Sequence, residues 1–181
     1  MRRGLVVGAA GSGKTTFAHR LAALTGVPRI ELDALNWGPG WAAVELAVFR
    51  ERVTAATAGD TWVVDGNYSV VRDIYLNRAD TIVWLDLPLS TCLIRVIRRT
   101  ARRARAGEEL WGTGNRESWR KLFGRDSLVW WVLTTHRRRR RELGALCAEA
   151  ALAAVDVHRF ASSAAADAWL VALGEAAAPT S

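Results

Sequence analysis

The feature that most constrains this chain is a glycine-rich stretch near its start, residues 8–15, with the sequence Gly-Ala-Ala-Gly-Ser-Gly-Lys-Thr. It fits the pattern G-x-x-x-x-G-K-[ST] at every fixed position. An apolar, partly β-branched run at residues 5–7 precedes it, and Phe17, Leu21 and Leu24 follow it at helical spacing. The pattern is specific only where a strand leads into the loop and a helix leads out of it. The sequence predicts both, so we expect a strand–loop–helix unit here.

Such a loop binds phosphate for physical reasons. Its glycines let successive backbone N–H groups turn toward one anion, and the helix that follows adds the positive end of its dipole. We therefore expect ATP to bind here, with Lys14 reaching the β- and γ-phosphates and the Thr15 hydroxyl ligating Mg²⁺. A turn that merely connects strand to helix would not need the Lys-Thr pair. The predicted nucleotide-binding residues are Gly8, Ala9, Ala10, Gly11, Ser12, Gly13, Lys14, Thr15 and Thr16.

Strand-like and helix-like patterns alternate along the rest of the chain. The further predicted strands are 29–33, 61–65, 81–86 and 153–158, and the main predicted helices are 14–25, 44–59, 90–105, 119–150 and 163–173. Strands that alternate with helices form a parallel sheet covered on both faces. We therefore predict an α/β fold of the P-loop NTPase class, with a five-stranded parallel sheet, in one domain spanning residues 1–181.

The net charge of +7 is concentrated in one segment. Residues 95–141 contain fourteen Arg and one Lys against four acidic residues, a local net charge of +11, so the rest of the chain is slightly acidic. A uniformly basic protein would indicate general affinity for nucleic acids or membranes. A single basic segment on an acidic body favours a local anion site instead.

Other sequence features indicate a cytoplasmic protein without a membrane partner. No apolar run approaches the roughly 18 residues that a membrane span needs. The first five residues lead into a strand rather than into the apolar core of a signal peptide. Cys92 and Cys147 lie in separate helical patterns, and we expect them to be buried free thiols in a reducing compartment.

Three aspartates end predicted strands, and the carboxyl ends of parallel strands meet at the edge where ligands bind. Asp65 is expected to lie near Mg²⁺ or to orient the acceptor, with a turn-forming role before Gly66 as the alternative. Asp33 is the candidate to accept a hydrogen bond from an acceptor hydroxyl, although it could instead cap the following loop. Asp86 is expected simply to end its strand. The predicted metal ligands are thus Thr15 and Asp65.

The predicted helix 90–105 has an apolar face and an arginine face. The apolar face comprises Leu89, Leu93, Val96, Ile97, Thr100 and Ala104, and the opposite face Arg95, Arg98, Arg99, Arg102 and Arg105. Charged helix faces are usually solvated. This arginine face, however, has no local ion-pair partners, because residues 87–107 contain no Asp or Glu. The planar, permanently charged guanidinium suits an approaching polyphosphate.

Two further patterns leave alternatives open. The five consecutive arginines at 137–141 point in all directions around a helix, so they do not form one nucleic-acid-reading face, and no DNA-binding signature accompanies them. Most are expected to be solvated. Trp37 and Trp41 flank a Gly-Pro-Gly turn and could stack on a planar acceptor or anchor an irregular loop to the core.

Together these motifs resemble those of the adenylate-kinase-related P-loop kinases. The resemblance is closer to the bacterial group labelled DNA topology modulation proteins, and it covers almost the whole chain. The segments that carry it are 8–15, 32–37, 39–41, 65–68, 84–88, 111–112, 115–118 and 130–141.

The resemblance implies a mobile lid at about 99–120 and an acceptor-side insert at about 33–58. It also implies that Arg95 and Arg99 contact the donor nucleotide, and that Arg125 and Arg137 are the arginines that follow the lid. A closed lid would exclude water. The family's Asp-Gly-x-Pro-Arg motif is matched here only by Asp65 and Gly66, which argues against AMP as the acceptor.

Two functions remain open at this stage. The first is an Mg-ATP-dependent phosphotransferase that acts on a nucleotide, a nucleoside or another small hydroxyl compound. Its predicted catalytic residues are Lys14, Asp33, Arg95, Arg99 and Arg125. The second is a regulatory ATP-binding protein that acts on DNA. Arginines beside the glycine-rich loop favour the kinase, and arginines on a remote face favour DNA.

Overall fold

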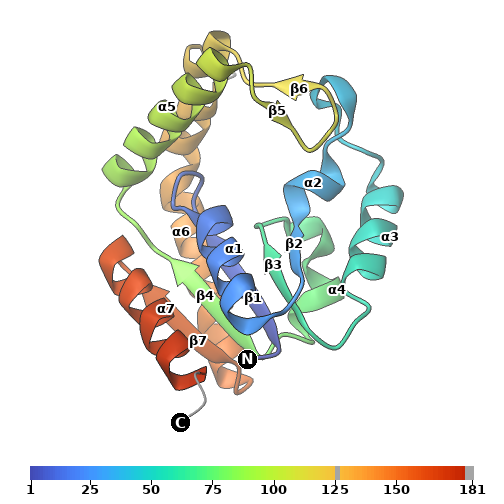
Figure 1. The fold of residues 1–181 in the computed structure, drawn as a ribbon, viewed down its shortest axis with the longest axis vertical. Coiled ribbons are helices and arrows are strands. Elements are labelled where there is room, and N and C mark those ends of the chain that lie inside the picture. The colour runs from blue at the N-terminus through green and yellow to red at the C-terminus, as the bar shows by residue number, and fades with distance from the viewer. Residues whose placement is uncertain (125–126, 178–181) are drawn as a thin grey trace.

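The computed structural model describes residues 1–124 and 127–177, and a single parallel sheet forms its centre. The sheet has five strands in the order β2-β3-β1-β4-β7 (Figure 1). They are β1 (Arg3–Gly8), β2 (Arg29–Glu31), β3 (Trp62–Asp65), β4 (Thr81–Leu85) and β7 (Asp156–Phe160). The predicted α/β fold with a five-stranded parallel sheet is confirmed.

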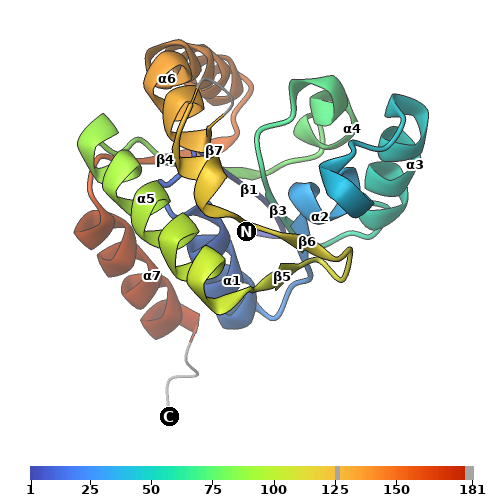
Figure 2. The ribbon, with the colours of Figure 1, turned by 90° about the horizontal axis from the view of Figure 1, so that it is seen from above.

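Helices cover both faces of the sheet (Figure 2). On one face lie α1 (Lys14–Thr25) and α7 (Ser163–Ala177), and on the other lie α3 (Leu46–Ala56), α4 (Arg72–Leu76) and α6 (Leu128–Leu152). Successive side chains of β1 alternate between the two layers: Leu5 and Val7 pack with α3 and α6, and Val6 packs with α1 and α7. Both faces are therefore buried, which explains the uninterrupted apolar run in this strand.

The remaining elements complete the chain. They are the helices α2 (Leu32–Asn36) and α5 (Leu89–Ala106), the 3₁₀ turns η1 (Pro39–Trp41), η2 (Ser69–Val71) and η3 (Trp119–Leu122), and the strands β5 (Glu109–Leu110) and β6 (Asn115–Arg116). The strands β5 and β6 pair antiparallel and form a small hairpin. Figure 1 shows this hairpin at the top of the molecule, reaching from α5 toward α2.

Three predicted boundaries are wrong. The helix predicted over 119–150 begins only at Leu128, because residues 119–122 form η3 and Gly124 has a φ of +88°, which does not fit a right-handed helix. The second strand ends at Glu31, so Asp33 lies in the short helix α2 rather than at a strand end. The last strand begins at Asp156 rather than at residue 153, because α6 continues to Leu152. The residues between 145 and 154 are rich in alanine, which has the strongest helix propensity and so extends the helix.

The predicted apolar face of α5 is also partly wrong. The buried residues of this helix are Cys92, Val96 and Thr100, whereas Ile97 is 44% exposed. The reason is that α5 packs against the P-loop and α6 rather than flat on the sheet, so Val96 meets Val132 of α6. This orientation turns part of the arginine face toward the P-loop.

Both cysteines are buried and unpaired, as predicted. Among the described helices, none combines the length and the apolar composition that a bilayer crossing would require.

Helix α1 offers a matched test of this packing. Leu21 is fully buried between the sheet and α7, whereas Leu24, one turn later, is 44% exposed. We expect Leu21→Ala to lower the free energy of unfolding by roughly 2–5 kcal/mol, because it leaves a cavity in a close-packed layer. Leu24→Ala should cost less than about 1 kcal/mol. Urea denaturation of both variants checks this, and equal losses would contradict the described position of α1.

Candidate active site

The glycine-rich loop at residues 8–15, from here on called the P-loop, lies at the centre of the sheet edge because β1 pairs with both β3 and β4. The loop opens into a cavity of about 1100 Å³. Its walls come from the P-loop and α1, from α5 and the start of α6, and from residues of β2, α2, β3 and the hairpin. Nucleotide and acceptor sites of parallel α/β proteins lie at such an edge.

Two glycines of the loop are required by geometry. Gly11 has a φ of +81°, and a Cβ atom there would lie 2.2 Å from the carbonyl oxygen of Cys92, so any larger residue would push the loop away from α5. Gly13 has a φ of +94° and is the N-cap of α1, without a side-chain hydrogen bond to the helix. The first N–H groups of α1 are therefore available to an anion.

Lys14 lies inside this loop. Its Nζ donates a hydrogen bond to the carbonyl oxygen of Ala9 at 3.0 Å. Burial lowers the pKa of the Lys14 ammonium, and the carboxylates of Asp65 and Asp33 act in the opposite direction. The three side chains are thus close enough to interact electrostatically, with the cation between the P-loop and the two carboxylates.

Asn67 fixes the start of the P-loop. Its Oδ1 accepts a hydrogen bond from the backbone N–H of Gly8 at 3.3 Å, and its Nδ2 donates to the carbonyl oxygen of the same residue. The loop after β3 therefore sets the position of the loop after β1.

Asp65 is buried at the end of β3, beside Thr15. Burial raises the pKa of its carboxyl group, while the charge of Lys14 and a hydrogen bond with the Thr15 side chain oppose this shift. A hydroxyl and a carboxylate beside a phosphate site are the protein ligands that Mg²⁺ uses. Among the described residues, no group of three or more His, Cys, Asp or Glu side chains is placed to hold a metal ion.

Asp33 is held by a hydrogen-bond network. The Tyr68 hydroxyl donates to Asp33 Oδ1 at 2.6 Å, and it interacts in turn with the side chains of Asn36 and Trp37. Burial, followed by the charge of Asp33, raises the pKa of the Tyr68 phenol well above its usual range, so the phenol stays protonated and keeps donating. Asp33 Oδ2 has no hydrogen-bond partner among the described residues and is free to accept one.

Arginines from α5 and α6 face the P-loop across the cavity. Arg95 donates to the carbonyl oxygen of Ser12 at 3.1 Å and to Ser163 Oγ at 2.7 Å. Arg103 pairs with Glu117 at 3.0 Å, and Arg99 and Arg102 also line the cavity. Burial lowers the pKa of the Arg99 guanidinium, against the charge of Glu117.

Buried polar atoms without hydrogen-bond partners gather around this cavity. The described residues contain eight such side-chain atoms, and six of them belong to residues that line it: Ser12, Arg99, Thr100, Arg103, Glu117 and Arg139. Unsatisfied buried groups are rare and costly in folded proteins. Three of the six atoms are arginine Nε donors, on Arg99, Arg103 and Arg139, and donors of this kind suit an anionic ligand.

The hairpin closes the cavity from above. Asn115 is buried, donates to the carbonyl oxygen of Gly38 at 2.8 Å, and accepts from the N–H of Trp41 at 2.9 Å. Trp111 Nε1 donates to Glu31 at 3.0 Å, and its ring meets Trp41 edge-to-face at 5.9 Å. Trp41 and Trp111 are two of the three non-glycine residues with positive φ in the described chain, so the backbone is strained on both sides of this contact.

The structure brings most of the predicted site residues together. Around one cavity lie Ala10 to Thr16 of the P-loop together with Asp33, Asp65, Arg95 and Arg99. Gly8 and Ala9 act from the loop's base through their backbone atoms. Arg125 lies outside the described residues.

Other arginines are placed differently from the prediction. Arg139, rather than Arg137, lines the P-loop cavity from α6, and Arg98 and Arg105 do not line it. Asp86 does not face the P-loop cavity either but is bound by Arg140 and Arg159.

No role was predicted for Tyr68, Asn115 or Trp111, although all three lie in segments that carry the family resemblance. Their partners are 35, 77 and 80 residues away. The one available signal was that two of them follow glycine-containing turns beside predicted site residues.

The sequence matches no protein-family model and no curated protein. Among solved structures, shikimate kinase from Bacteroides thetaiotaomicron aligns with a TM-score of 0.58 and 14% identity over 97% of both chains. Gluconokinase from Sinorhizobium meliloti 1021 aligns with a TM-score of 0.51 and 20% identity, over 97% of this chain and 94% of that one. Shikimate kinase from Acinetobacter baumannii, in complex with shikimate, gives 0.53 and 19%, over 97% and 93%.

The chain has a P-loop kinase fold. Its five-stranded parallel sheet and helical layers match those of shikimate kinase and gluconokinase. The expected likeness to the adenylate-kinase-like kinases is thus confirmed at the level of the fold. At identities of 20% or less, these alignments show the fold alone.

The raised pKa of Asp65 predicts a pH effect on stability. Because the folded-state pKa lies above the ordinary value of 3.8, the folded protein holds this proton more tightly than the unfolded chain does. This contribution is complete below pH 3.8 and is lost as the pH rises through the folded-state pKa. Asp65→Asn removes it, so the stability of the wild type minus that of the variant should fall as the pH rises.

Urea denaturation between about pH 4 and pH 8 measures this difference. The exposed Asp60→Asn serves as a control, for which the difference should stay flat. A difference that rises with pH for Asp65→Asn would contradict the prediction, because Lys14 and Thr15 would then favour the ionised carboxylate more than burial opposes it.

Proposed function

We propose that this protein is an Mg-ATP-dependent phosphotransferase that transfers the γ-phosphoryl group of ATP to a hydroxyl group of a small molecule. The observation that carries the proposal is that Lys14, Asp33 and arginines of α5 and α6 line one cavity at the P-loop. Residues 1–181 would act as one kinase-like domain, with 33–58 as the acceptor-side insert and 99–120 as the lid.

The donor half of the cavity suits a triphosphate. The N–H groups of the P-loop and the start of α1 would bind the phosphate chain, and Lys14 would exchange its bond to Ala9 for the β- and γ-phosphate oxygens. Arg95 and Arg99 approach from the opposite side and would stabilise the charge that spreads over the transferred group. Arg125 remains a proposed member of this set.

Thr15 and Asp65 would hold Mg²⁺. Their side chains are hydrogen-bonded to each other at the base of the cavity, which suits a hydroxyl ligand and a carboxylate that acts directly or through water. Held there, the ion would supply positive charge that offsets the negative charge of the phosphate chain.

The acceptor half supplies the proton acceptor. The acceptor hydroxyl would donate to Asp33 Oδ2 while its oxygen attacks the γ-phosphorus of ATP. The bond from that phosphorus to the β–γ bridging oxygen breaks, ADP leaves, and the hydroxyl proton passes to Asp33, which then releases it to water. The roof formed by Trp41 and Trp111 would exclude water and so suppress hydrolysis of ATP.

The structural neighbours support a small hydroxyl compound as the acceptor, since they are kinases named for shikimate and gluconate. The aromatic walls formed by Trp37 and Trp41 also suit a ring-shaped acceptor such as a nucleoside. Two buried, unpaired cysteines are consistent with action in the cytoplasm.

The DNA-directed alternative rests on the sequence resemblance to the DNA topology modulation group, and we keep membership of that group as a proposal. Arginines beside the glycine-rich loop favour a kinase, and arginines on a remote face favour DNA; at this site the arginines favour the kinase. Arg95, Arg99, Arg102, Arg103 and Arg139 all line the P-loop cavity, where a phosphate chain and a small acceptor fit but a duplex does not.

ATP turnover in the presence of an acceptor panel tests the proposal. The panel contains nucleosides, nucleotides, neutral polyols, shikimate and gluconate, with double-stranded DNA as a further addition. We expect at least one small hydroxyl compound to raise turnover well above the rate with water alone, and Lys14→Ala to reduce that rate by roughly 10²–10³-fold. If DNA alone stimulated ATP turnover, the kinase proposal would be wrong and the DNA-directed function would be favoured.

Tyr68 should act as a positioning residue for Asp33. Tyr68→Phe removes the 2.6 Å hydrogen bond to Oδ1, so the carboxylate is no longer fixed toward the acceptor. We expect kcat to fall by roughly tenfold with little change in KM, because the acceptor is still bound but its proton is less well aligned. Steady-state kinetics with the best acceptor measure this.

The matched control is Tyr75→Phe, since Tyr75 is also a buried tyrosine but does not line the cavity. Its hydroxyl makes only a 3.4 Å contact with the carbonyl oxygen of Tyr68. If both variants lost kcat equally, the effect of Tyr68→Phe would be structural and not one of positioning.

A further inference from the structure

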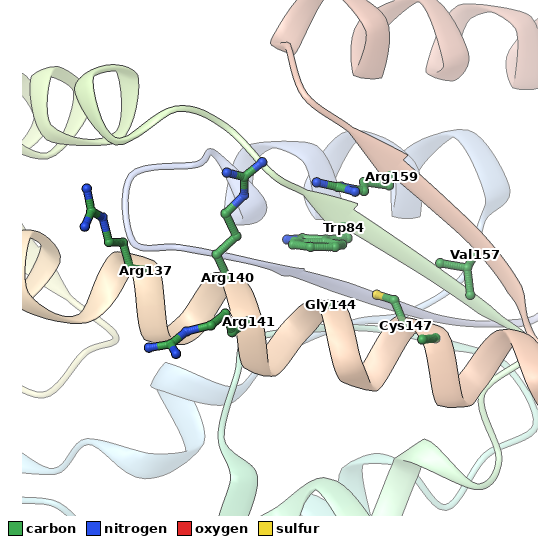
Figure 3. Close-up of a pocket in the computed structure, with 9 residues that line it drawn as sticks. Trp84, Arg137, Arg140, Arg141, Gly144, Cys147, Val157 and Arg159 are labelled. Atoms are coloured by element: carbon green, nitrogen blue, oxygen red, sulfur yellow. The ribbon is translucent and has the colours of Figure 1, made fainter.

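A second cavity, of about 870 Å³, lies between α6 and the strands β4 and β7 (Figure 3). No described residue lines both this cavity and the one at the P-loop. We call it the arginine groove, because four arginines line it: Arg137, Arg140, Arg141 and Arg159. The ring of Trp84, from β4, forms part of its wall. No site was predicted here, because most of the arginines at 137–141 were expected to be solvated.

Helical spacing explains the groove. Arg137, Arg140 and Arg141 lie on the same face of α6 as Gly144 and Ala148, one and two turns further on. The small residues let α6 pass close to the sheet and leave space above the ring of Trp84. A Cβ atom at Gly144 would already lie 3.5 Å from this ring.

Asp86 brings two of the arginines together. Arg140 Nε donates to Asp86 Oδ1 at 2.7 Å, and Arg159 Nε donates to Oδ2 at 3.0 Å. The guanidinium of Arg159 also lies over the face of Trp84, 4.6 Å from the ring centre (Figure 3). The Asp86 carboxylate is buried, whereas the side chains of Arg140 and Arg159 are 54% and 53% exposed and remain accessible from the groove.

The charge of the groove is not balanced. Four guanidinium groups surround it, and the only carboxylate that contacts them among the described residues is Asp86. Glu142 pairs with Arg138 and Arg139, which lie outside the groove. Arg137 and Arg141 have no ion-pair partner in the described chain.

We propose that the arginine groove binds a small molecule that carries two or more linked phosphate groups. Each guanidinium presents paired N–H donors that match phosphate oxygens. The described lining contains no Asn, Gln, Ser or Thr side chain that would read a base or a sugar, so recognition falls on the phosphates. Trp84, Cys147 and Val157 supply the apolar remainder of the wall.

The groove suits a compact polyphosphate better than it suits DNA. A duplex is bound by cations spread along its backbone, typically at 6–10 phosphates. Within the run 137–141, Arg138 and Arg139 are paired with Glu142 and Arg140 is tied to Asp86. Arg137 and Arg141, two exposed arginines without ion-pair partners one turn apart on α6, line the groove and suit a diphosphate or triphosphate.

Calorimetric titration of the full-length protein with inorganic pyrophosphate tests the proposal. The wild type should show two binding sites, one at the P-loop and one in the groove. Lys14→Ala should weaken the first alone. The double variant Arg137→Ala/Arg141→Ala should weaken the second by about tenfold or more, since two charge-assisted contacts are lost.

The matched control is Arg105→Ala/Arg138→Ala, which removes the same charge from exposed positions that line neither cavity. It should keep both sites. The proposal is overturned if the wild type shows no second site up to about 5 mM pyrophosphate, or if both double variants lose affinity equally through net charge. It is also overturned if Arg137→Ala/Arg141→Ala weakens binding of a DNA duplex and leaves pyrophosphate binding unchanged.

Discussion

The hydrogen bonding of β1 to strands on both sides is the constraint on which the rest of this structure depends. Because β3 and β4 pair with β1 in parallel, the glycine-rich loop emerges between their carboxyl ends, beside Asp65 and Asp86. The same pairing lets Asn67 reach the backbone of Gly8, and it carries α5 from the end of β4 against Gly11. Phosphate site, carboxylates and arginine helix thus follow from the position of one strand.

Local patterns were enough to predict the sheet, the loop and the arginine helix, because each depends on residues that are neighbours in sequence. What they could not predict is contact between distant segments. The bond from Tyr68 to Asp33 joins residues 35 positions apart, and the contacts of Asn115 join the hairpin to η1. Amphipathic spacing also left open which element packs against the apolar face of α5. The sheet does not cover this face, because Ile97 is exposed.

Carboxylates sort the many arginines of this chain into different environments. Where a buried or nearby carboxylate is present, the guanidinium is tied into the fold, as with Arg140 and Arg159 at Asp86 or Arg103 at Glu117. Where none contacts it, as with Arg99 at the P-loop, the cation faces a cavity and its buried Nε lacks a partner. The scarcity of acidic residues in this part of the sequence leaves several of these arginines without an ion pair among the described residues, and some of them line the two cavities.

The bonds of Asn115 have a consequence for the order of events in a catalytic cycle. They attach the hairpin to the backbone of the acceptor-side loop at Gly38 and Trp41 and not to a bound molecule. Lifting the hairpin from the nucleotide side therefore also removes a wall of the acceptor side. If residues 99–120 open as the proposed lid, both products would be freed by one opening step, and neither substrate would be exchanged alone before it.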